Sequence, residues 1–209
     1  MSEIKLVIFD CDGVMFDSRE ANRAYYNHLR THFGQPPLDE EELSYVHMQH
    51  VAESVRFLFR EQPVKLAAVE RYRHQLDYTP FLQYMRMEPD LPTFLEWLQP
   101  RCKTAISTNR TSTLSLVLAR HQLEGCFDQV VTARDVANPK PHPEALEKIL
   151  GQLQIPRTAA IYIGDSQVDR EHTAAAGIPL IAFKNPALAA EYHVESFMEI
   201  TALPPFTTA

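Results

Sequence analysis

The sequence predicts an α/β fold, a doubly wound parallel sheet whose core is interrupted by an all-helical insertion. Short apolar runs that are typical of buried strands lie at residues 4–9, 103–107, 129–132, 159–163 and 180–183. Helical patterns separate the later runs, and strands that alternate with helices indicate a parallel sheet. Between the first two runs lies a long segment with helical periodicity and no strand pattern.

The first strand ends in two carboxylates, within the stretch "VIFDCDGVMFD". Side chains two residues apart share a face of a strand, so Asp10 and Asp12 can converge while Cys11 points away. Neighbouring carboxylates repel each other, and they stay together only with a cation or a shared proton between them.

Residues 18–89 form the predicted insertion, and residues 1–17 and 90–209 form the predicted α/β core. The stretches "SREANRAYYNHLRTHF" and "VAESVRFLFREQ" have amphipathic helical spacing, and "GQPPLDEEE" and "MEPDLP" supply turns. In the core, "TSTLSLVLARHQLEG" starts with hydroxyl residues and ends in glycine, as a capped helix does. A proline lies near the first turn of a second predicted helix, "HPEALEKILGQL".

Polar residues follow the ends of the predicted strands. "STNRT" follows the second run, a loop to "NPKPHP" follows the third, and "GDSQVD" follows the fourth. Ligands of parallel α/β sheets bind beyond the carboxyl ends of the strands, so these residues are expected to meet at one edge.

The expected cluster contains an excess of carboxylates. Lys140 offsets part of the charge of four acids, which are Asp10, Asp12, Asp165 and Asp169. Such a site needs a divalent cation, and carboxylate oxygens without histidine or cysteine suit Mg²⁺ rather than zinc.

The same edge offers groups that suit a phosphate. The hydroxyl of Thr108 and the amide of Asn109 can donate to phosphate oxygens, and Lys140 adds a positive charge. Whether Ser107 or Thr108 supplies the hydroxyl is open at this point.

The composition excludes several classes of partner. A net charge of −7 gives no support to a nucleic acid partner and disfavours anionic membranes. No apolar stretch reaches the roughly 20 residues of a membrane span. The three cysteines show no paired spacing, so we expect a reduced, cytoplasmic setting.

Four motifs carry a family resemblance: "DCDGV", "STN", "PKPHP" and "GDSQVD". Their order resembles that of the haloacid dehalogenase-like hydrolases, in particular the phosphoglycolate phosphatase-like subgroup, from residue 4 to about 183. The resemblance implies a Rossmann-like core and a helical cap between the first two motifs. It also implies a phosphatase that acts on a small phosphorylated metabolite.

The resemblance further implies a phosphoaspartate mechanism, in which Asp10 is the nucleophile and Asp12 is the acid and base. Thr108 and Lys140 would hold the phosphoryl group, and Thr108 is chosen over Ser107 because asparagine follows it directly, as in the pattern of the family. The implied Mg²⁺ ligands are Asp10, Asp165 and the backbone carbonyl of Asp12, with Asp169 in support.

Two alternatives to a phosphatase stay open at the level of the sequence. A phosphomutase would pass the phosphoryl group to a sugar hydroxyl in place of water. A phosphoacceptor or binding module would use the same groups without turnover. The substrate, the choice between monomer and homodimer and the cap residues that select the ester are not encoded in any motif, although His47, His50 and Arg56 are candidates to contact the ester.

Overall fold

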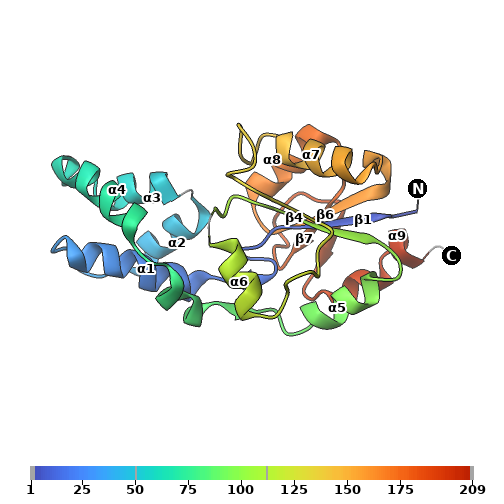
Figure 1. Cartoon of the computed structure of the whole chain (residues 1–209), viewed down its shortest axis with the longest axis horizontal. Coiled ribbons are helices and arrows are strands. Elements are labelled where there is room, and N and C mark those ends of the chain that lie inside the picture. Colours follow the sequence, from blue (N-terminus) through green and yellow to red (C-terminus); the bar gives the residue numbers. More distant parts are fainter. Residues whose placement is uncertain (1–2, 50, 112, 208–209) are drawn as a thin grey trace. The chain divides into compact units, whose positions relative to one another are not determined.

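A computed structural model of the chain describes residues 3–49, 51–111 and 113–207 (Figure 1). The chain divides into two compact units. The first consists of Met1–Phe16 and Met87–Ala209 and contains a six-stranded sheet, and the second is Asp17–Arg86. The predicted α/β class with a helical insertion is confirmed.

The sheet has the strand order β5-β4-β1-β6-β7-β8, and its neighbouring strands pair in parallel. The chain therefore builds outward from β1 on one side and then from β6 on the other, which is the doubly wound arrangement. The strands are β1 Leu6–Phe9, β4 Lys103–Thr108, β5 Gln129–Thr132, β6 Ala160–Gly164, β7 Leu180–Phe183 and β8 Tyr192–Val194. The five predicted strands are all present, and β8 is an addition that the sequence did not predict.

Helices cover both faces of this sheet, with α7 and α8 on one face and α5 on the other (Figure 1). Leu6 and Ile8 of β1 pack in the core beneath α7 and α8. Phe9 points to the opposite face, where its ring meets Phe94 and Phe197 at centroid distances of 6.1 and 5.9 Å. The helices of this unit are α5 Leu91–Leu98, α6 Leu114–Arg120, α7 Glu144–Leu153, α8 Gln167–Ala176 and α9 Pro204–Thr207, with 3₁₀ turns η3 Arg157–Ala159 and η4 Met198–Ala202.

The second unit is built from helices around an aromatic and aliphatic core that includes Tyr25, Leu43 and Phe59. A reciprocal capping box between Asp39 and Glu42 starts α2. The helices and 3₁₀ turns of the second unit are α1 Arg19–His32, α2 Glu40–Met48, α3 Val51–Leu58, η1 Pro63–Lys65, α4 Leu66–Gln75 and η2 Thr79–Tyr84.

A very short strand within residues 18–89 departs from the expectation that the insertion contains no strand. β2 (Phe16–Asp17) and β3 (Arg86–Met87) form a separate two-stranded sheet. Two residues are too few to produce an alternating pattern, so the sequence carried no signal for them. Among the helices of the described ranges, none has the length and apolar character that a membrane crossing requires.

Candidate active site

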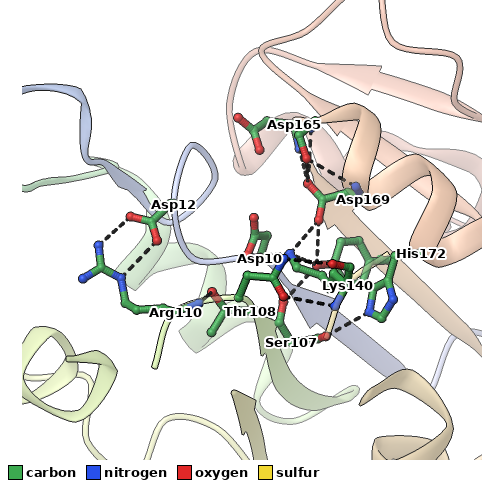
Figure 2. A network of polar contacts seen from close by, with 12 residues as sticks. Asp10, Asp12, Ser107, Thr108, Arg110, Lys140, Asp165, Asp169 and His172 are labelled. Atoms are coloured by element: carbon green, nitrogen blue, oxygen red, sulfur yellow. Dashed lines mark hydrogen bonds and ion pairs between the residues drawn. The ribbon is translucent and has the colours of Figure 1, made fainter. Parts of the chain in front are cut away.

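The carboxyl ends of β1, β4 and β6 lie side by side at one edge of the sheet. Phe9, the last residue of β1, is in register with Ile106 and Ile163 of its two neighbours. The next residue, Asp10, donates its backbone N–H to the carbonyl of Ile163 at 2.9 Å. The motifs that follow these strands therefore meet around Asp10, as predicted (Figure 2).

Lys140 lies at the centre of this cluster, and its side chain is only 4% exposed. Its Nζ is 2.9 Å from Asp10 Oδ1 and 2.7 Å from Asp169 Oδ1. Burial alone lowers the pKa of the ammonium, but the two carboxylates reverse this effect and raise the pKa above its usual value. Lys140 is therefore a permanent positive charge, shared between two acids.

Asp10, Asp165 and Asp169 form an acidic group in which one ligand atom from each lies within 4.8 Å of the others. Burial raises the pKa of Asp10 to about 7, although the charge of Lys140 opposes the rise and that of Asp169 adds to it. Burial, together with the charges of Asp10 and Asp169, raises the pKa of Asp165 to about 8. Three carboxylates against one ammonium leave an excess of negative charge. These oxygen donors fit a hard divalent cation, which would restore the charge balance.

Asp169 has both carboxylate oxygens engaged by the protein. Oδ1 accepts from Lys140 and lies 3.0 Å from the Tyr162 hydroxyl, and Oδ2 accepts from the Ser166 hydroxyl at 2.7 Å. Ser166 and Asp169 also form the capping box of α8. Burial opposes ionisation here, but Lys140 and the hydrogen bonds hold the pKa of Asp169 below its usual value. Asp169 is thus an ionised support for Lys140.

Asn109 binds the backbone of Lys140. Its Nδ2 donates to the Lys140 carbonyl at 3.1 Å, and its Oδ1 accepts from the Lys140 N–H at 3.0 Å. The sequence suggested this amide as a donor to phosphate, whereas here it ties the end of β4 to the loop that carries the lysine.

The hydroxyls of Ser107 and Thr108 face different surroundings. Ser107 is buried against His172, whose Nδ1 lies 2.8 Å from the carbonyl of His142. A carbonyl only accepts, so Nδ1 carries the proton and Nε2 accepts from the Ser107 hydroxyl at 3.0 Å. Burial, together with the charge of Lys140, lowers the pKa of His172 to about 4 and keeps it neutral. Ser107 is therefore engaged within the core, which favours Thr108 as the hydroxyl that faces a ligand.

Asp12 lies outside this cluster in the orientation that the structure shows. Figure 2 shows its carboxylate turned toward Arg110. Arg110 Nη2 donates to Asp12 Oδ1 at 2.6 Å, and Arg110 Nε donates to Oδ2 at 3.0 Å. The sequence did not reveal this pair.

Three functional contacts were missed at the level of the sequence: those of Arg110, Tyr162 and His172. Arg110 follows the predicted phosphate-binding pair directly, and a cation at that position is a signal that could have been used. Tyr162 lies in β6, on the same face of the strand as Gly164 at its carboxyl end. Its hydroxyl is the polar group in an otherwise apolar run, and this is a signal that could have been used. For His172, spacing carried no signal.

Of the residues proposed to contact the ester from the helical insertion, His47 lies 3.0 Å from Asn22, between ring Nδ1 and amide Nδ2. Arg56 is exposed on α3. His50 lies outside the described residues.

The raised pKa values predict how Mg²⁺ affects stability. Without metal, the folded protein binds more protons at Asp10 and Asp165 than the unfolded chain does, so the stability that these two carboxyl groups contribute falls as pH rises from about 4 to about 8. Mg²⁺ competes with those protons. We therefore expect Mg²⁺ to raise the Tm more at about pH 9 than at about pH 6.5. His172 is not a proposed metal ligand, so its titration affects the Tm with and without Mg²⁺ alike.

Differential scanning fluorimetry with and without Mg²⁺ measures this effect. The Asp165→Asn variant is the control, and its Tm should respond weakly to Mg²⁺ at both pH values. An equal shift in the wild type at both pH values would contradict the expectation.

Comparison with known proteins identifies the family of the chain. The sequence model described as "Haloacid dehalogenase-like hydrolase" matches residues 7–183. A phosphoglycolate phosphatase from Rhodobacter capsulatus is 27% identical over 214 residues, which cover 95% of this chain and 94% of that protein. The pyrophosphatase PpaX from Bacillus pumilus is 29% identical over 180 residues, covering 84% and 81%.

A solved structure gives the same result. The crystal structure of a haloacid dehalogenase-superfamily hydrolase of subfamily IA from Geobacter sulfurreducens has a TM-score of 0.83 and 39% identity, with 95% of each chain covered. The match to the family also runs from the first strand of the sheet to the end of β7. On these grounds, the chain belongs to the haloacid dehalogenase-like hydrolases.

Proposed function

We propose that this protein is a Mg²⁺-dependent phosphatase that hydrolyses a small phosphorylated metabolite through a phosphoaspartate intermediate. The observation that carries the proposal is the position of Asp10, at the end of β1 and 2.9 Å from the buried Lys140 ammonium. Relatives named phosphoglycolate phosphatase and pyrophosphatase support the reaction class.

In the first half-reaction, a carboxylate oxygen of Asp10 attacks phosphorus, and the bond between phosphorus and the ester oxygen breaks. Asp12 donates a proton to that leaving oxygen. Lys140 and the Thr108 hydroxyl stabilise the negative charge on the phosphoryl oxygens, as preorganised donors do.

In the second half-reaction, Asp12 takes a proton from water, and the water oxygen attacks the phosphorus of the phosphoaspartate. The bond to Asp10 breaks, which frees inorganic phosphate and restores the carboxylate. The same group thus serves as acid and then as base.

Asp10, Asp165 and the backbone carbonyl of Asp12 would hold the metal. Asp169 would support them through Lys140 and Ser166, because both of its oxygens already accept hydrogen bonds. When bound, Mg²⁺ neutralises the acidic group and offsets charge on the phosphoryl oxygens.

The test is phosphate release from a panel of phosphorylated metabolites, with and without Mg²⁺. We expect turnover of one or a few esters, abolished by a chelator and lowered about 10⁴-fold or more by Asp10→Asn, which removes the nucleophile. Retained turnover in Asp10→Asn would rule out the proposed nucleophile.

Other outcomes point to the alternatives. Transfer between two hydroxyls of a sugar phosphate without release of phosphate would indicate a phosphomutase. A stable phosphoaspartate without turnover would indicate a phosphoacceptor module.

A further inference from the structure

Asp12, the proposed proton-transferring group, has both of its carboxylate oxygens bound by the guanidinium of Arg110. The Arg110 side chain is only 7% exposed, and two of its nitrogens bind the two carboxylate oxygens of Asp12. This fork geometry matches a carboxylate or a phosphate group. Arg110 thus binds an anion that the chain itself supplies.

The proposed reaction requires Asp12 to leave this arrangement. The carboxylate that Arg110 binds carries no proton. To protonate a leaving oxygen, Asp12 has to give up at least one bond to Arg110, take up a proton from solvent and turn toward the phosphoryl group. Loss of a carboxylate partner is unfavourable for a buried guanidinium.

We infer that Asp12 occupies the place of a second anionic group on the substrate, and that Arg110 is the residue that recognises this group. The inference rests on the proposed function. A substrate whose leaving group bears a carboxylate or a further phosphate replaces Asp12 on Arg110 and so releases Asp12 for proton transfer. An ester without a second anion provides no such replacement.

The spacing of the two aspartates limits the size of the substrate. Asp10 and Asp12 are two residues apart, and two residues of extended chain span at most about 7 Å. The two side chains and Arg110 add to that span, so the second anion belongs to the leaving group of a small substrate and not to a distant part of a large one. Phosphoglycolate and pyrophosphate have this chemistry, whereas ethyl phosphate has a leaving group of similar size without the anion.

The test compares kcat/KM for these three compounds in the wild type and in Arg110→Met. We expect the wild type to prefer the anion-bearing compounds. In Arg110→Met the preference should fall by about 30-fold, or about 2 kcal/mol at about 1.4 kcal/mol per factor of ten. Arg110→Lys should lie between the two, because lysine keeps the charge without the fork. Arg120→Met, at an exposed arginine of α6, is the matched control and should keep the wild-type preference.

Binding to Asp10→Asn by isothermal titration calorimetry gives a readout without turnover. Adding Arg110→Met should weaken the binding of the anion-bearing compounds and leave ethyl phosphate nearly unaffected. Preference for phosphoglycolate alone would identify a carboxylate as the second anion, and preference for pyrophosphate alone would identify a phosphate.

The inference is overturned if the wild type shows no preference for a second anion, or if Arg110→Met keeps the preference. If the wild type turns over none of the compounds in the wider panel, the proposed function fails instead, and the calorimetric comparison still tests Arg110. If Arg110→Met has a much lower Tm than the wild type, the substrate preference of Arg110→Lys is used in its place. An unchanged preference in Arg110→Lys then overturns the inference.

Discussion

Replacing Lys140 with methionine should destabilise the protein by roughly 3–5 kcal/mol and lower kcat by roughly 10²–10³-fold. The substitution leaves Asp10 and Asp169 facing each other without the ammonium that lies 2.9 and 2.7 Å from their oxygens. Breaking a buried ion pair is costly because the remaining charge stays out of water. Urea unfolding gives the change in the free energy of unfolding, and phosphate release gives kcat.

Lys103→Met is the matched control, since Lys103 also pairs with an aspartate, Asp128, at 2.6 Å, but its side chain is 59% exposed. An exposed pair contributes less than about 1 kcal/mol, so this variant should stay close to the wild type. Adding Asp169→Asn to Lys140→Met should recover part of the stability and none of the activity. Equal stability losses in Lys140→Met and Lys103→Met would contradict this account of the site.

Replacing Gly13 with alanine should weaken Mg²⁺ binding by at least about 10-fold and reduce turnover with it. Gly13 has φ +81°, and a Cβ there would lie 2.0 Å from Asp165 Oδ2. The added methyl group therefore forces the Asp165 carboxylate out of its place in the acidic group. Mg²⁺ affinity is measured from the metal dependence of kcat/KM and of the Tm.

Gly125→Ala separates this displacement from backbone strain. Gly125 has φ +77°, and a Cβ added there would have no atom of the described residues within 4 Å beyond its chain neighbours, so alanine meets only the left-handed conformation. Both variants should lose about 1–2 kcal/mol of stability from that conformation. Only Gly13→Ala should lose metal affinity, and a similar loss in Gly125→Ala would refute the role of the contact with Asp165.

The fold was predictable from the sequence because the central strands are buried on both faces. β1 and β6 are apolar along their whole length, so each appeared as a run that ends at a polar motif. β8 was missed because it has three residues, two of them at least partly exposed, and includes His193. Helix α6 ends at Arg120, before the glycine that was expected to end it, so the cap signal gave the right element with the wrong boundary.

The candidate site was predictable where it depends on strand ends and not where it depends on side-chain direction. Asp10, Lys140 and Asp165 follow strands or their loops, so sheet topology alone brings them together. The pair of Asp12 and Arg110 joins residues 98 positions apart, and its formation depends on the path of the loop after β4. No periodicity or spacing encodes that path.

The capping box of α8 limits how this protein can change. Asp169 both begins the helix, through Ser166, and neutralises Lys140. One side chain thus belongs to the folding of the core and to the charge of the site, so the two properties cannot be optimised separately. Engineering for heat tolerance is best directed away from the first turn of α8. A substitution that stabilises the helix there also changes the charge beside Lys140, and with it the attraction of Lys140 for a ligand.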